Sequence, residues 1–128
     1  MKYFDSVLDL VGHTPLVRLN KLSPAGGATI YAKMEQTNPG GSVKDRMALN
    51  MVRRAEEQGL IQPGATLVES TSGNTGLGLA VVAAVRGYRS IFTIPDKMSK
   101  EKIDMLKAYG SEVVVTRTDL DHDHPESY

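Results

Sequence analysis

The pattern of hydrophobic and polar positions becomes regular after Pro63 and Gly64. From there, short apolar runs alternate with longer stretches of helical character, with only a few polar residues between them. This alternation is typical of βαβ units, which build a parallel sheet with right-handed crossovers. The expected elements are strand 66–69, helix 75–86, strand 90–94, helix 99–108 and strand 112–116. The pattern predicts an α/β fold whose helix 75–86, apolar on nearly every side, is deeply buried.

The first part of the chain has a less regular pattern. The expected elements are a short helix over 5–11, strands over 16–19 and 29–35, and a helix over 42–58. The two strands can pair as a hairpin across the loop at 23–27. The short helix is expected to turn four apolar residues inward, Val7, Leu8, Leu10 and Val11. In the longer helix the apolar residues recur close to a 3.6 period, and Gly59 marks its end.

Composition indicates one globular domain and excludes several kinds of function. The 128 residues are 41% hydrophobic, with 15 basic and 15 acidic side chains. A zero net charge argues against a nucleic-acid or anionic-membrane partner, and it permits self-association. The absence of cysteine excludes disulfides, thiolate metal sites and a cysteine nucleophile. Without a signal-like start or about 18 consecutive apolar residues, we expect a cytoplasmic protein.

A glycine-rich run places a lysine at the mouth of the expected helix 42–58. The run reads Asn-Pro-Gly-Gly-Ser-Val-Lys-Asp-Arg over residues 38–46, with the lysine at Lys44. Ser42 is a good N-cap, and Asp45 three residues later resembles a capping box. The positive end of the helix macrodipole favours a neutral amine there, and burial would lower the pKa of Lys44 further. A neutral lysine amine is what Schiff-base formation with an aldehyde requires.

A second run predicts an anion site. It reads Glu-Ser-Thr-Ser-Gly-Asn-Thr-Gly over residues 69–76, between an expected strand and an expected helix. Unpaired N–H groups at a helix start attract carboxylates or phosphates, and hydroxyls add further donors. The glycine spacing matches neither the dinucleotide fingerprint nor the Walker loop. Each run alone has an ordinary alternative: a surface lysine at a helix start, and a βα turn that binds nothing.

Other charged clusters have simpler interpretations. Four lysines, Lys97, Lys100, Lys102 and Lys107, alternate with acids and are most simply a solvated helix face with spaced ion pairs. The tail offers possible metal ligands, Asp121, His122, Asp123 and His124, but we predict no metal site there. Residues 125–127 look like the first turn of another helix, so we expect the sequence to be cut short.

Taken together and in order, the two runs carry a resemblance to a known family. The chain resembles the fold-type II pyridoxal-phosphate enzymes, the cysteine synthase and cystathionine β-synthase group, from Gly12 to Ser127. The resemblance implies a three-layer αβα fold with a mostly parallel sheet, as in the tryptophan synthase β chain, here truncated. It assigns residues 1–43 to the start of the large domain and 44–128 to most of the smaller one. The remainder of the family fold has no place in this sequence.

The resemblance also implies roles for individual residues. Lys44 would bind pyridoxal phosphate covalently and then act as the general base, and Asn74 would hydrogen-bond the ring hydroxyl. The substrate carboxylate would be bound by a set of four residues, Thr71, Ser72, Gly73 and Thr75. The family's glycine-rich phosphate loop lies in the second half of its members and has no position here. We therefore expect the 128-residue chain alone to bind the cofactor weakly.

The implied reaction is β-replacement on serine or an O-activated serine by a thiol or sulfide. Small-molecule substrates are thus the expected partners, with a homodimer expected for the full-length form. Three stretches look more like cystathionine β-synthases than cysteine synthases: 86–88, 95–99 and 125–127. The alternative is a catalytically incompetent fragment, or a module that associates with another polypeptide.

Overall fold

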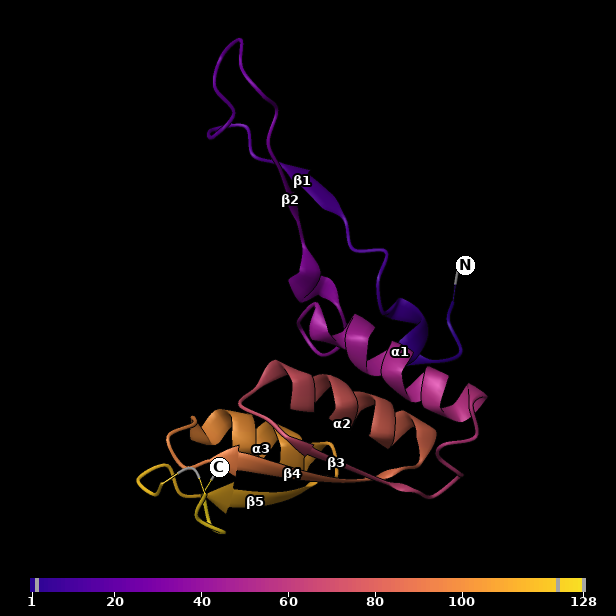
Figure 1. Ribbon diagram of the computed structural model, residues 1–128. Helices are drawn as coiled ribbons and strands as arrows, with labels where there is room; N and C mark the ends of the chain where they lie inside the picture. The colour runs from indigo at the N-terminus through magenta and orange to yellow at the C-terminus, as the bar shows by residue number, and fades with distance from the viewer. Residues whose placement is uncertain (2, 122, 128) are drawn as a thin grey trace.

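A computed structural model describes residues 1, 3–121 and 123–127 of the chain. Figure 1 shows a body of helices over a sheet, with a hairpin extending away from it. The N-terminal elements are the 3-10 helix η1 (Val7–Leu10), β1 (Leu16–Arg18), β2 (Tyr31–Lys33), the 3-10 helix η2 (Glu35–Thr37) and α1 (Lys44–Glu57). The later elements are β3 (Thr66–Ser70), α2 (Asn74–Arg86), β4 (Arg89–Pro95), α3 (Lys100–Ala108) and β5 (Glu112–Thr116).

Strands β3, β4 and β5 form a parallel sheet in sequence order. Its register pairs Val68 with Ile91 and Thr93 with Val114. Because each crossover moves to the next strand in the same direction, the right-handed rule places α2 and α3 on the same face. The predicted α/β class and parallel sheet are confirmed.

The helices lie on one side of this sheet, and α1 packs on the outside of α2 (Figure 1). On the opposite face, Val68 is 67% exposed and Val114 is 43% exposed. The residues that the structure describes therefore supply only one helix-covered face of the expected αβα sandwich. The expected division at residue 43 stays a prediction.

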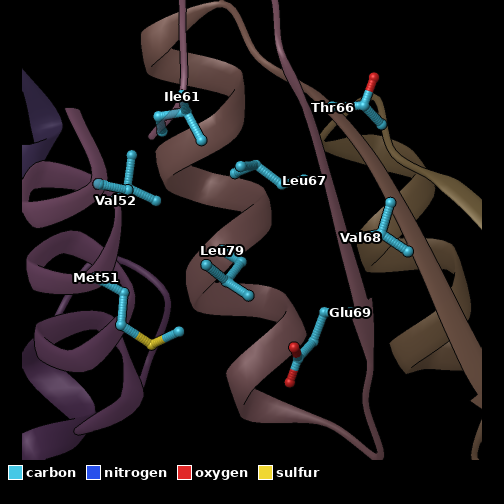
Figure 2. A pocket seen from close by; sticks show the side chains of 9 residues that line it. Met51, Val52, Ile61, Thr66, Leu67, Val68, Glu69 and Leu79 are labelled. Carbon is cyan, nitrogen blue, oxygen red and sulfur yellow. The ribbon is translucent and has the colours of Figure 1, made fainter. Parts of the chain in front are cut away.

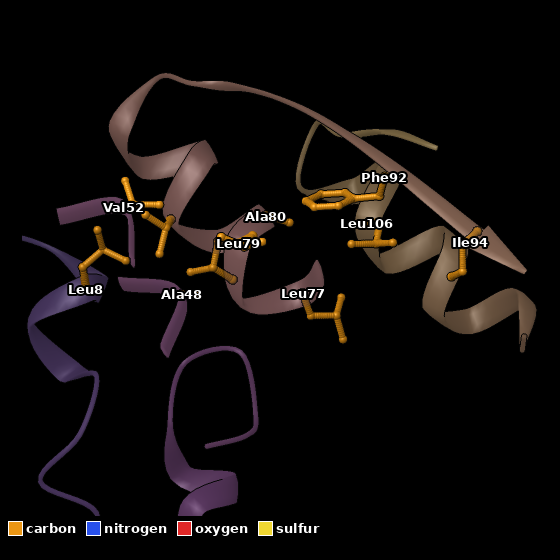
Figure 3. Packing of buried hydrophobic residues seen from close by; sticks show 11 residues of the cluster. Leu8, Ala48, Val52, Leu77, Leu79, Ala80, Phe92, Ile94 and Leu106 are labelled. Atoms are coloured by element: carbon orange, nitrogen blue, oxygen red, sulfur yellow. The ribbon is translucent and has the colours of Figure 1, made fainter. Parts of the chain in front are cut away.

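The core lies between the sheet and the helices α2 and α3, and it continues on the other side of α2 toward α1 and η1 (Figure 3). Phe92 and Ile94 point from β4 toward Leu106 of α3, and all three side chains are almost fully buried. Full burial of such a side chain contributes about 1.5–3 kcal/mol, so β4 is the centre of the fold. As predicted, α2 is buried along most of its length, from Gly76 to Ala83. Its apolar side chains pack against the sheet on one side and against α1 on the other.

The N-terminal region differs most from its prediction. The expected helix over 5–11 is a 3-10 helix of four residues, capped by Ser6, in which only Leu8 is buried. The predicted hairpin is confirmed, but its second strand ends at Lys33 because the chain turns into η2 at Glu35. All three residues of β1 are exposed.

The tail also differs from its prediction. Residues 125–127 do not begin a helix; Ser127 instead forms a bridge to Arg117, just beyond β5. Within the described ranges, no helix combines the length and apolar character needed to cross a membrane.

Candidate functional site

Lys44 is the first residue of α1, and its side chain is exposed. Its backbone N–H donates to the Ser42 hydroxyl oxygen at 3.1 Å, so Ser42 does accept from the start of the helix. The expected capping box is wrong, however, because Val43 occupies the N-cap position and makes no side-chain cap. Burial would favour a neutral amine at Lys44, but the described residues leave its side chain exposed.

Asp45 performs a different task from the predicted one. Its side chain is 2% exposed, and one carboxylate oxygen accepts the backbone N–H of Gly40. A Cβ atom on Gly40 would collide with this carboxylate, so only glycine fits there. Burial raises the pKa of the Asp45 carboxyl, and its second oxygen finds no hydrogen-bond partner in the described part of the chain. Asp45 thus pins the loop that precedes Lys44.

The second run lies at the carboxyl end of β3 and opens α2. Thr71 is buried, and its hydroxyl oxygen accepts from the N–H groups of Gly73 at 3.2 Å and Gly76 at 3.0 Å. A Cβ atom on Gly76 would lie 2.4 Å from the Thr71 methyl carbon, which explains the glycine. Thr71 therefore shapes the loop from inside, and its predicted contact with a substrate carboxylate stays a prediction.

The rest of this loop faces an open polar hollow. Ser72 and Asn74 are exposed, and Thr75 is half-buried. The hollow is lined by one residue of the first run, seven of the second run and one residue outside both, namely Lys44, then Glu69, Ser70, Thr71, Ser72, Gly73, Asn74 and Thr75, and Lys102. The structure thus brings together all the site residues predicted from the sequence. Ligands of open α/β sheets bind at the carboxyl ends of strands, which is where this hollow lies.

Lys102 was not predicted to belong to the site. Its ammonium donates to the Ser72 carbonyl oxygen at 3.4 Å, and a Cβ atom on Gly73 would lie 2.8 Å from it. The predicted solvated face is correct for Lys100, which pairs with Asp104 at 2.7 Å. Lys102 turns toward the loop instead, a contact between distant elements that no local charge pattern reveals.

An apolar hollow lies beside the polar one, between α1, α2 and β3 (Figure 2). Met51, Leu67 and Leu79 are among its lining residues, and Glu69 borders both hollows. Lys44 does not line it. Few polar groups line this apolar hollow, so the polar hollow is the candidate functional site.

A hydrogen-bonded cluster around the Glu35 carboxylate was also not predicted. Glu35 accepts from the Arg46 guanidinium at 2.9 and 3.0 Å, from the Thr14 hydroxyl at 2.8 Å and from the Asn38 amide at 2.9 Å. The hydrogen bonds from Arg46 lower the pKa of the Glu35 carboxyl to about 2, with further contributions from Thr14 and Asn38. Arg46 is the last residue of the first run, but no local pattern in the sequence indicates Glu35 as its partner.

The possible metal ligands of the tail do not assemble in the described structure. His122 lies outside the described residues. Among those that are described, no group of three or more His, Asp or Glu side chains could hold a metal ion.

Comparison with known proteins places the two runs in a family context. The family model described as pyridoxal-phosphate dependent enzyme matches residues 7–127. A probable cysteine synthase of Bacillus subtilis (strain 168) is 55% identical over 116 residues, or 91% of this chain and 37% of that protein. The cystathionine beta-synthase of Saccharomyces cerevisiae is 55% identical over 126 residues, or 96% of this chain and 25% of that protein.

Solved structures agree with this likeness. The crystal structure of O-ureido-L-serine synthase superposes with a TM-score of 0.89 at 47% identity, over 95% of this chain and 38% of that one. A hydrogen sulfide-producing enzyme from Fusobacterium nucleatum gives a TM-score of 0.84 at 47% identity, over 91% of this chain and 39% of that one. The chain spans between 25% and 37% of the length of the curated relatives described above.

Proposed function

The chain belongs to the family of pyridoxal-phosphate dependent enzymes, and on that premise we propose that it carries the lysine and anion loop of a β-replacement site. The proposed substrates are serine or an O-activated serine, with a thiol or sulfide as the second reactant. Support comes from relatives named cysteine synthase and cystathionine beta-synthase, which are equally similar at 55% identity. Their equal similarity leaves both β-replacement reactions within the proposal.

The observation that carries the proposal is the polar hollow that Lys44 shares with the loop Ser72–Thr75. Its donor set fits pyridoxal phosphate and an amino acid: an accessible amine, an exposed amide on Asn74 and hydroxyls on Ser72 and Thr75. When bound, the cofactor supplies an electron sink for negative charge at the substrate α-carbon. Thus the residues present match the chemistry that the group needs at this end of the sheet.

Each side chain has a proposed task. Lys44 Nζ would hold the cofactor through its aldehyde carbon, with loss of water, and once the substrate amine had taken its place it would accept the proton from the substrate α-carbon. Asn74 orients the cofactor's ring hydroxyl. Ser72 and Thr75, together with the N–H groups at the start of α2, bind the substrate carboxylate, which the helix N-terminus favours electrostatically. Gly73 has no side chain, so its backbone can approach the carboxylate closely.

The test is covalent trapping at Lys44. Pyridoxal phosphate is added to the purified chain, visible absorption is recorded, and the imine is reduced with borohydride and located by peptide mass mapping. We expect a visible band and a modified Lys44, both of which Lys44→Ala abolishes. Lys102→Ala is the matched control, because it removes the other amine of the hollow, and its Lys44 should still be trapped. A band that survives in Lys44→Ala would disprove the assignment.

A second candidate function is an association module of such an enzyme. The exposed face of the sheet at Val68 and Val114 favours it, since paired polypeptide would bury this apolar surface. For the chain alone, we propose weak cofactor binding and slow turnover. Normal specific activity in the purified 128-residue protein would contradict this second candidate.

A further inference from the structure

We propose that Glu35 is a positioning residue for the amine of Lys44, acting through Arg46 and Asn38. This inference rests on the proposed function, in which Lys44 condenses with the cofactor aldehyde. Glu35 does not line the hollow that contains Lys44. Its effect on Lys44 must therefore pass through the backbone of the loop and the first turn of α1.

The first half of the connection is the contact between Glu35 and Arg46. Arg46 Nε donates to one carboxylate oxygen at 2.9 Å, and Nη2 donates to the other at 3.0 Å. Two parallel bonds of this kind restrain orientation as well as distance. Arg46 follows Lys44 by two residues in the same helical turn, so this pair holds the start of α1 against η2.

The second half is the contact between Glu35 and Asn38, at the other end of the lysine loop. The buried Asn38 amide donates to Glu35 Oε2 at 2.9 Å and to the Glu35 carbonyl at 2.8 Å. Its own oxygen accepts from Gly12 N–H at 2.8 Å. One carboxylate therefore joins residue 38 to residue 46, and Lys44 lies between these two anchors.

Lys44 depends on this anchoring because its own side chain has little support. It is exposed, and within the described part of the chain its backbone N–H donates to Ser42 alone. The direction of the long side chain is therefore set by where the backbone starts the helix. A displacement of about 1 Å at a reacting group can cost about 100-fold in rate. Loss of either anchor would move the amine by letting the loop shift relative to α1.

Thr14 completes the cluster and allows a milder test. Its hydroxyl donates to Glu35 at 2.8 Å and accepts from Arg46 at 3.0 Å. Because Thr14→Val preserves the shape of the side chain, it removes these two bonds and leaves the Glu35–Arg46 pair in place. Glu35→Gln is more severe, since its amide N–H₂ would face the donors of Arg46 or Asn38.

The experiment measures borohydride trapping of pyridoxal phosphate at Lys44 in wild type, Glu35→Gln, Glu35→Asp and Thr14→Val. Glu56→Gln is the matched control, because Glu56 lies on α1 far from Lys44 and also binds an arginine, Arg86, at 3.3 Å. Hydrogen exchange at the amides of Gly40 and Lys44, without cofactor, gives a second readout. Urea unfolding of each variant separates local displacement from lost stability.

We expect Glu35→Gln to reduce the initial rate of trapping about tenfold or more and to speed exchange at Gly40 and Lys44. Thr14→Val should change both readouts in the same direction by less, and Glu35→Asp should fall between Glu35→Gln and wild type. Glu56→Gln should leave both readouts within about twofold of wild type, even where its unfolding midpoint falls equally.

The outcomes separate this inference from the function on which it rests. Trapping in wild type that Glu35→Gln and Thr14→Val leave unchanged would overturn the role of Glu35 and keep that of Lys44. Equal losses in Glu35→Gln and Glu56→Gln would also overturn it, as a general effect of stability. No trapping at Lys44 in wild type would overturn both proposals. If Glu35→Gln fails to fold, Thr14→Val decides.

Discussion

Gly78 of α2 packs directly against Ala48 of α1, where a Cβ atom on residue 78 would lie 3.1 Å from that of Ala48. The same atom would lie 3.1 Å from the carbonyl oxygen of Lys44. A missing side chain on one helix therefore sets how closely it approaches the first turn of the other. Because both helices begin at the same end of the molecule (Figure 1), this contact also sets the spacing between Lys44 and the anion loop.

Gly78→Val should force the two helices apart. Overpacking of this kind costs about 1–3 kcal/mol, and here one of the crowded atoms belongs to the backbone and cannot rotate away. We expect a lower unfolding midpoint in urea and reduced trapping at Lys44. Ala84→Val, at an exposed position of the same helix, is the control and should change stability by less than about 1 kcal/mol. Equal effects of the two substitutions would contradict the packing argument.

Thr71→Val should open the anion loop, because it removes the acceptor of two buried N–H groups, those of Gly73 and Gly76. A buried unsatisfied donor costs about 1–3 kcal/mol. Thr71→Ser retains the hydroxyl and should therefore lose less stability than Thr71→Val. Urea unfolding and hydrogen exchange at Gly76 are the measurements. Equal losses in Thr71→Ser and Thr71→Val would contradict this assignment, because only the valine variant lacks the hydroxyl acceptor.

Stability should fall in acid partly through Glu35. Hydrogen bonds from Arg46 lower the pKa of its carboxyl to about 2, below the value of about 4.3 expected in the unfolded chain. The carboxylate therefore stabilises the fold fully above about pH 4.3, and this contribution is lost as the pH falls toward 2. Unfolding midpoints of wild type and Glu35→Gln, measured from pH 7 to pH 2, should converge in acid.

Asp45 acts in the opposite direction and at higher pH, because its pKa in the folded protein is raised above the value in the unfolded chain. Burial raises the pKa of its carboxyl, so protonation in acid relieves an unfavourable buried charge. Asp45 is present in both wild type and Glu35→Gln, so its contribution cancels when the unfolding midpoint of one protein is subtracted from that of the other. A constant difference between their midpoints at all pH values would contradict the lowered pKa of Glu35.

Tyr88→Phe should loosen the far ends of α1 and α2. The Tyr88 hydroxyl donates to Glu56 at 2.9 Å, and we expect its loss to cost about 1 kcal/mol. Trapping at Lys44 should remain unchanged, since the contact lies at the opposite end of α1 from the lysine. The exposed Tyr31 of the hairpin provides a control, Tyr31→Phe, with no expected effect on urea unfolding.

The βαβ part of the fold was predictable because its pattern is local. The strand at 112–116 was predicted with its observed bounds, and α2 begins one residue before its predicted start. The N-terminal part was less predictable because its conformation depends on distant partners. The strand predicted over 29–35 ends before Glu35, which hydrogen-bonds Thr14 and Arg46. The pattern of apolar and polar residues along the chain does not indicate either contact.

The candidate site shows the same division. The spacing of glycines, hydroxyls and lysine predicted the two runs that share the hollow. Local spacing predicted a capping box for Asp45 and could not reveal that its carboxylate accepts from Gly40 instead. Nor could it reveal that Lys102 approaches Ser72 from another helix. In α1, apolar character did not decide which side chains are buried, because Met51 is 48% exposed while the polar Asp45 is buried.

The hairpin of β1 and β2 stands away from the body, with every residue of β1 exposed (Figure 1). Its ladder has three residue pairs and little apolar surface to protect it, so it should open by local unfolding while the body remains intact. Proteases would then cut near its tip first. The amides of β4, the buried central strand, would exchange only through global unfolding, so opening of the hairpin would leave the hollow at the carboxyl ends of the strands intact.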